Sequence, residues 1–316
     1  MRRIALVSLL ALFVAACASR GATRHVKAAI KAAGGKDKLR TVENYHVATE
    51  GTWLGEPYTA IAHDEREGSW RWDMKSEGMS MSSWVIGGNV YVSTEGQPAV
   101  TQSGDEAMNW HMHRFVGTSV LLPDRLLEAD VTLAEADAVT LDGKQCPAIT
   151  ATHKGETVTF VFDPDNKMIR QVHFTMPDPE SGKEMPSTIT LSDWDVYDSI
   201  TVAGKSVMTM QMGDKTYEIR ESVEDIIWNE QIPEGTLSVP EIAPPLEFNV
   251  KTVPARRMAV HTFVGPYQDV SAGIDDVMTW VTENGGTPSG NVTLVYRELY
   301  PEDFNKSKRV IQVPVT

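Results

Sequence analysis

Short stretches in which apolar and polar residues alternate cover most of the chain. Between residues 45 and 94 these stretches are separated by glycine-containing turns, among them Glu67-Gly68 and Gly87-Gly88. A two-residue period bounded by turn residues predicts β-strands. Strands this close in sequence pair antiparallel, because a parallel crossover needs a dozen or more residues. The predicted strands are 45–54, 58–66, 69–76, 79–86 and 89–94.

Two segments have helical spacing instead. Residues 23–35 predict one helix, which ends at Gly34-Gly35. Residues 105–128 predict one or two short helices, broken near Gly117 and Pro123. Strands then resume at 131–141, 146–153, 156–163, 167–175, 187–197, 205–212 and 215–228. This order predicts a mainly β, or α+β, fold: a curved antiparallel open sheet (a half-barrel) with a few helices.

A proline-rich stretch divides the chain into two domains. Residues 239–246 form the predicted linker, because prolines cannot donate to a sheet and favour an extended backbone. The first domain is 23–238 and the second is 247–316. Within the second, the pattern predicts a small βαββ module with elements at 247–263, 268–284, 291–300 and 308–315.

The N-terminus has the layout of an export signal. A basic start at Arg2 and Arg3 precedes an apolar run that ends at Ala16, directly before Cys17. This run is too short to span a bilayer as a helix, which needs about 20 apolar residues. Residues 1–16 are therefore predicted to be a signal peptide, although an ordinary secretory signal with a chance cysteine is the alternative.

The sequence Val14-Ala15-Ala16-Cys17 resembles the bacterial lipobox. The resemblance implies cleavage before Cys17, a lipid on its sulfur, and a tether over 17–22. Ala18 stands where aspartate would mark retention at the inner membrane in enterobacterial sorting, so the resemblance implies the outer membrane, with the protein facing the periplasm. A lipidated Cys17 would leave Cys146 without a disulfide partner, so Cys146 is expected to be a small buried apolar residue.

The net charge of the chain argues against some classes of binding partner. The 316 residues carry a net charge of −14, and loss of Arg2 and Arg3 with the signal would lower it by two. Such a charge argues against nucleic acid and against lying flat on anionic lipid. No apolar run after residue 17 approaches a spanning length. Contact with the membrane is therefore expected through the anchor only.

The first domain resembles the LolA/LolB type of lipoprotein carrier. The resemblance covers about residues 23–240 and rests on Ala32-Ala33-Gly34-Gly35 with Leu39 after it, on the hairpin 162–167, and on the closing 228–235. It implies a curved sheet closed by helices over an apolar cavity. An antiparallel lipocalin-like barrel fits the strands nearly as well.

The second domain resembles one half of the GyrI-like, or effector-binding, fold. The matching pieces are Val253-Pro254-Ala255, 264–267, Trp280 with Gly285 behind it, Val295-Tyr296 and 310–315. Members of this family bind drug-like or cationic small molecules in a groove between two such modules. One module leaves half a groove, so two chains could pair as a homodimer to complete it.

Aromatic residues in both domains are candidate ligand contacts. In the second domain, Tyr296, Glu298 and Tyr300 share a strand face by the two-residue period and could bind a cation. The resemblance adds Tyr267 and Trp280, but the acid that the family has just before the strand tyrosine is missing at Leu294 and Val295. In the first domain the candidates are Trp70, Trp72 and Trp84, among frequent methionines. Ordinary edge-strand and core packing are the alternatives.

No metal, cofactor or catalytic motif is predicted. His111 and His113 lack a carboxylate or cysteine to complete a metal set and are interpreted as a solvated surface pair. The leading hypothesis is a non-catalytic, lipid-anchored envelope protein that binds an apolar or amphipathic small molecule or lipid. The alternatives are a hydrolase that uses Glu298 as its base, and a structural or interaction lipoprotein without a small ligand.

Overall fold

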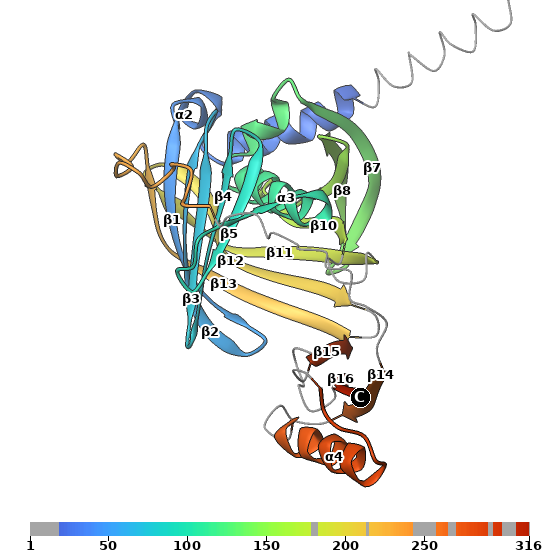
Figure 1. Cartoon of the computed structure of the whole chain (residues 1–316). Coiled ribbons are helices and arrows are strands. Elements are labelled where there is room, and N and C mark those ends of the chain that lie inside the picture. Colours follow the sequence, from blue (N-terminus) through green and yellow to red (C-terminus); the bar gives the residue numbers. More distant parts are fainter. Residues whose placement is uncertain are drawn as a thin grey trace, which may run out of the picture. The chain divides into compact units, whose positions relative to one another are not determined.

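The computed structural model describes residues 19–177, 183–212, 215–242, 257–264, 270–289, 293–298 and 308–315. The chain divides into two compact units, Met1–Pro244 and Pro245–Thr316, each of which folds around its own core (Figure 1). In the described part of the chain, none of the helices combines the length and the apolar character needed to cross a bilayer.

The first unit is built on one antiparallel sheet of thirteen strands. Its order is β6-β5-β4-β3-β2-β1-β13-β12-β11-β10-β9-β8-β7. The first and last strands of this unit, β1 and β13, are therefore neighbours in the middle of the sheet. The strands are β1 (Asn44–Trp53), β2 (Glu56–Glu65), β3 (Trp70–Ser76), β4 (Met79–Ile86), β5 (Asn89–Thr94), β6 (Val100–Gln102), β7 (Val131–Leu141), β8 (Lys144–His153), β9 (Glu156–Phe162), β10 (Ile169–Pro177), β11 (Glu184–Tyr197), β12 (Ile200–Met212) and β13 (Lys215–Trp228).

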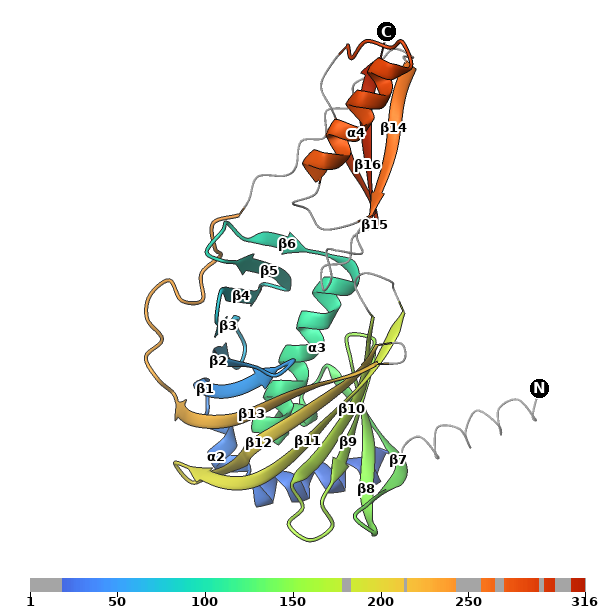
Figure 2. The same ribbon diagram turned by 90° about the horizontal axis from the view of Figure 1, so that it is seen from below.

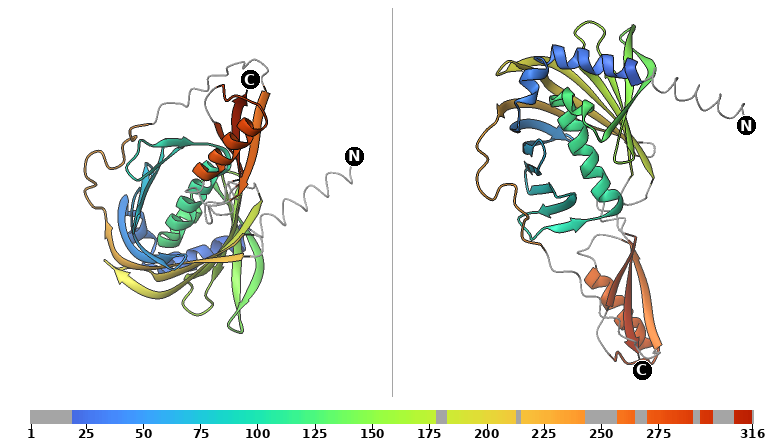
Figure 3. Two further views of the ribbon diagram at one scale, coloured as in Figure 1. Left: turned by 60° about the horizontal axis from the view of Figure 1, so that its bottom comes forward. Right: turned by 90° about the horizontal axis from the view of Figure 1, so that it is seen from above.

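This sheet curves around a helix. Figures 2 and 3 show α3 (Gly104–Leu121) within the curve, followed by the short 3-10 helix η1 (Pro123–Leu127). A helix over residues 19–32 and α2 (Lys36–Arg40) lie near one end of the sheet. Apolar residues of the helix and of α3 join those of β8–β12 in the main core, with Val26, Leu126, Ile149, Phe160 and Ile200 almost fully buried. The predicted open antiparallel sheet with a few helices is confirmed.

The helix prediction was wrong in one respect. α3 continues through Gly117 without a break and ends only before Pro123, where η1 begins. Glycine costs a helix about 1 kcal/mol relative to alanine but does not stop it, whereas proline lacks the N–H that the next turn needs. Cys146 is fully buried and unpaired, as the sequence predicts.

After β13 the chain returns along the outside of the sheet. Residues 229–242 run past β1 towards β6 (Figure 2). The Arg71 guanidinium donates to the carbonyl oxygen of Thr236 (3.3 Å), and the Ala99 N–H donates to that of Glu241 (2.7 Å). We call the side of the sheet that faces α3 the concave face, and the opposite side the convex face.

The second unit has the predicted βαββ order. Its described elements are β14 (Arg257–Val264), α4 (Val270–Glu283), β15 (Thr293–Glu298) and β16 (Lys308–Val315), with the sheet order β14-β16-β15. α4 packs Val277 and Val281 against Ala259 of β14 and against Ile311 and Val313 of β16. The amphipathic helix therefore supplies the core of this small unit.

Candidate ligand-binding site

Aromatic side chains of β3 and α3 meet on the concave face. The rings of Trp70 and Trp72 lie 6.2 and 5.8 Å from the ring of Trp110, and 5.7 and 5.6 Å from the ring of His113, between centroids. Residues two apart on a strand point to the same side of the sheet. The contact of Trp70 and Trp72 with α3 therefore identifies, through the strand register, which side chains of the neighbouring strands also lie on the concave face.

The concave face remains apolar beyond this cluster. Met74 of β3 pairs with Ala60 of β2 and Met81 of β4 and packs beside Tyr58. Trp53 of β1 pairs with Ile219 of β13. Several apolar side chains of the concave face, and Trp110 of α3 opposite them, are only partly buried. Those of the sheet are Trp53, Trp72, Met81, Met208 and Ile219. Apolar surface thus stays accessible on the concave face.

The face of α3 towards β1–β3 is also accessible. His113 and Gly117 lie one helical turn apart and both are exposed to solvent. Burial among protein atoms nevertheless lowers the pKa of His113 to about 4, so the imidazole is neutral at pH 7. A Cβ added at Gly117 would meet no neighbouring atom within 4 Å. The exposed imidazole of His113 and the free space beside Gly117 show that other side chains leave this stretch of α3 uncovered.

The carboxyl group of Glu221 lies on this apolar face. Glu221 of β13 accepts a hydrogen bond at Oε1 from the Tyr58 hydroxyl (2.7 Å) and one at Oε2 from the Ser206 hydroxyl (3.3 Å). Burial is the main cause that raises the pKa of Glu221, and burial together with the Glu221 charge raises that of Tyr58. A Cβ at Gly51, opposite Glu221, would meet the backbone carbonyl oxygen of Arg220 first and would lie 2.8 Å from the Tyr58 ring, which favours glycine there.

Replacing Glu221 with glutamine is expected to stabilise the protein at high pH and to leave it nearly unchanged at low pH. The folded pKa of Glu221 is raised, so its contribution to stability is complete below the unfolded pKa and is lost as the pH rises through the folded value. The difference amounts to about 1.4 kcal/mol for each pKa unit of the shift. Urea unfolding of both proteins from pH 4 to pH 9 measures it; a pH-independent difference would contradict the raised pKa.

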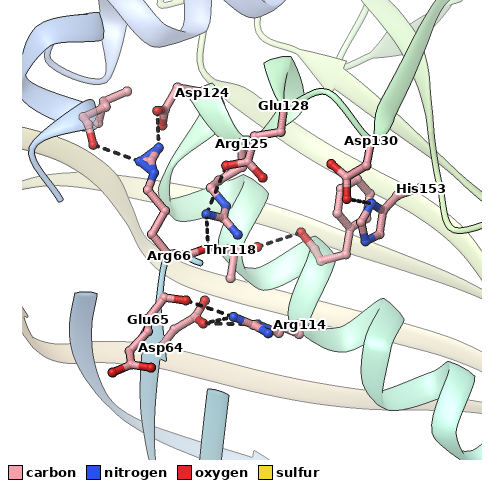
Figure 4. Close-up of polar contacts among 12 residues, drawn as sticks. Asp64, Glu65, Arg66, Arg114, Thr118, Asp124, Arg125, Glu128, Asp130 and His153 are labelled. Carbon is pink, nitrogen blue, oxygen red and sulfur yellow. Dashed lines mark hydrogen bonds and ion pairs between the residues drawn. The ribbon is translucent and has the colours of Figure 1, made fainter. Parts of the chain in front are cut away.

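Buried ion pairs hold α3 against the sheet (Figure 4). Asp64 of β2 is 1 % exposed and accepts hydrogen bonds from Arg114 of α3 (3.1 Å from Nε, 2.5 Å from Nη2) and from the Tyr45 hydroxyl (3.2 Å). Burial raises the pKa of Asp64 in spite of Arg114. Arg66, just after β2, pairs in the same way with Asp124 of η1. These contacts tie α3 and η1 to β2 and the residue after it.

The predicted aromatic candidates of the first domain divide between the two faces. Trp70 and Trp72 lie together on the concave face, whereas Trp84 lies on the convex face, where it packs with Tyr91 and Ala99. The Arg71 guanidinium stacks on the Trp84 ring at 5.0 Å from the centroid. His113, interpreted from sequence as a solvated surface residue, is exposed to solvent, but its ring also lies beside the rings of Trp70 and Trp72.

The candidates of the second domain and of the anchor are described only in part. Trp280 lies on α4 and is 57 % exposed. Tyr296 and Glu298 belong to β15, whose pairing with β16 shifts register between them, but their side chains lie outside the described structure. Cys17, Tyr267 and Tyr300 lie outside the described residues altogether, so their predicted roles remain predictions.

Three contributors to the concave face were missed by the sequence analysis: Trp110, Gly117 and Glu221. Trp110, His113 and Gly117 fall at i, i+3 and i+7, a spacing that places them on one helix face. Glu221 follows the apolar positions Tyr217 and Ile219 at the two-residue period of β13. These spacings predict that the residues share one face of the helix and one face of the strand. They do not predict that the helix face and the strand face lie opposite each other.

A groove on the convex face differs in its lining. It has a volume of about 400 Å³ and lies over β2–β5. Most of its lining is polar or charged, with Thr59, Asp73, Lys75, Ser80 and Ser82 among the contributors. This lining does not suit an apolar guest, which leaves the concave face as the better candidate.

Comparison with known proteins gives similarity at the level of fold. No protein-family model matches the chain, and no curated protein matches it. Among solved structures, a LolA superfamily protein from Nitrosomonas europaea is similar, with a TM-score of 0.46 and 10 % identity over 69 % of this chain and 97 % of the other. A DUF1329 family protein from Desulfovibrio piger has a TM-score of 0.43 and 9 % identity over the same shares.

Proposed function

We propose that the protein is a non-catalytic envelope lipoprotein that binds an apolar or amphipathic small molecule, such as a lipid, between α3 and the concave face. The observation that carries the proposal is the accessible apolar surface around Trp72, Trp110 and Gly117. Water released from such surface contributes about 25 cal/mol for each Å² that a guest buries.

The chemistry of the site favours a guest with one polar end. Methionine and tryptophan side chains provide adaptable and flat apolar contacts for a flexible chain. Glu221 and Tyr58 place a carboxyl and a hydroxyl on the same face, 2.7 Å apart. A carboxyl group can accept a hydrogen bond from a hydroxyl or amide of the guest and, where it is ionised, repels an anion. We therefore favour a neutral head group over an anionic one.

The cellular address in this proposal rests on the lipobox resemblance. A lipid on Cys17 would place the binding unit within a short tether of a membrane, where apolar guests are found. Acyl chains contribute about 0.8 kcal/mol per buried methylene, so several chains anchor a protein stably. Because residue 18 is alanine, the proposal places the anchor in the outer membrane, with the protein on its periplasmic side.

Energy transfer from tryptophan to a dansylated undecanoic acid tests the proposal. With the chain from residue 19 onwards, we expect saturable binding of one probe, with transfer from Trp110 among the donors. Trp110→Phe should reduce the transfer, because this ring borders the site. Trp280→Phe is the matched control, since Trp280 is exposed in the other unit.

Two results would count against binding at this site. Transfer that does not saturate would show non-specific partition of the probe. A loss that is larger for Trp280→Phe than for Trp110→Phe would move the site to the second unit.

A further inference from the structure

Two histidines and a glutamate converge on the convex face. His46 of β1 and His63 of β2 are direct cross-strand partners, and Glu230 follows the end of β13. One ring nitrogen of each histidine and one carboxylate oxygen of Glu230 all lie within 4.8 Å of one another. Within the described part of the chain, these three side chains are close enough together to hold one metal ion. We propose that these three side chains form a binding site for a divalent transition-metal ion of the zinc class.

The distances fit such an ion with small side-chain rotations. Zinc binds imidazole nitrogen at about 2.0–2.1 Å and carboxylate oxygen at about 2.0–2.2 Å, which places two tetrahedral ligands roughly 3.3 Å apart. The Nδ1 atom of His46 is already 3.0 Å from Oε2 of Glu230, and the two imidazole rings lie 4.7 Å apart between centroids. The donor set, imidazole with carboxylate, is one that zinc prefers.

His63 also has an unpartnered ring nitrogen. Nδ1 of His63 is buried and has no hydrogen-bond partner in the described structure. An ion pair between His46 and Glu230 alone would leave this nitrogen of His63 without a partner. A metal ion bound by all three side chains would use both imidazoles. The side chains of His46 and Glu230 are 22 % and 34 % exposed, so an ion and a water as fourth ligand can reach them.

An ion at this place would fasten three segments together. His46 and His63 belong to neighbouring strands, whereas Glu230 is the second residue of the segment 229–242 that returns along the convex face. Asn229 already ties this point to the chain before β1, through hydrogen bonds between its side chain and the backbone of Glu43 and Thr41. The expected role is therefore structural: the ion clamps the returning segment to β1 and β2.

Zinc titration of the full chain in detergent, after removal of metal with a chelator, tests the proposal. In competition with a chromophoric chelator we expect one Zn²⁺ per chain. His63→Gln and Glu230→Gln should each weaken binding at least tenfold, since even a residue that only supports a ligand is worth about 10–100-fold. Circular dichroism establishes that each variant is folded.

The matched control is His153→Gln. His153 lies 3.3 Å from Asp130 and so forms a histidine–carboxylate pair without a second histidine. Its replacement should leave zinc affinity unchanged. A second measurement needs no variant: zinc should raise the midpoint of thermal unfolding of the unmodified protein. No saturable site at one equivalent, an equal loss in His153→Gln, or an unchanged midpoint would each overturn the proposal.

Discussion

Replacing Arg114 with methionine is expected to destabilise the protein by about 3–5 kcal/mol, as for other buried pairs that lose one partner. The change leaves Asp64, which is 1 % exposed, without its cationic partner. The carbonyl oxygen of Glu65 also loses a donor at 3.0 Å. Urea unfolding followed by circular dichroism measures the loss.

Two comparisons identify the cause of this loss. Asp64→Asn combined with Arg114→Met should recover part of it, because the uncompensated charge is then absent. Arg220→Met is the matched control: its partner Glu218 lies 2.6 Å away, but both side chains are largely exposed, so the expected cost is below about 1 kcal/mol. A cost for Arg114→Met as small as that for Arg220→Met would show that this pair does not hold α3.

The strands could be predicted from sequence because a half-buried strand alternates and its turns are marked by glycine. β3, β4 and β5 begin and end within a residue of the predicted limits. The central pairing of β1 with β13 could not be predicted in the same way, since it joins segments more than 160 residues apart. Such a pairing depends on the curvature of the whole sheet, which no local pattern encodes.

The candidate site was predicted in part for the same reason. The two-residue period placed Trp70 and Trp72 on one face, and the structure brings both to α3. The period could not tell which face the helix would cover, and Trp84 therefore stood in the same group. Likewise, His63 and Glu230 are distant in sequence, so no ligand spacing marked the proposed metal site.

Filling the space beside Gly117 is expected to abolish ligand binding without unfolding the protein. Gly117→Trp would place a large ring on the accessible face of α3, next to His113, where a Cβ meets no neighbour within 4 Å. The loss should be at least tenfold in affinity for the dansylated probe, because the ring and the guest compete for one volume. Thermal unfolding should show a protein at least as stable as the original.

Gly117→Ala is the matched control for this change. It adds one methyl group, which leaves most of the space free, and it removes the conformational cost of glycine in a helix. The expected gain in stability is about 0.5–1 kcal/mol, with unchanged binding. A destabilised alanine variant would mean that position 117 is packed rather than open.

Native mass spectrometry of the chain purified from a bacterial envelope tests most directly whether the space between α3 and the concave face holds an apolar guest. The unmodified protein and Gly117→Ala should each carry a lipid-sized adduct that dissociates on activation, and Gly117→Trp should carry none. An unmodified protein without an adduct, or an adduct that persists in Gly117→Trp, would contradict a binding site at that place.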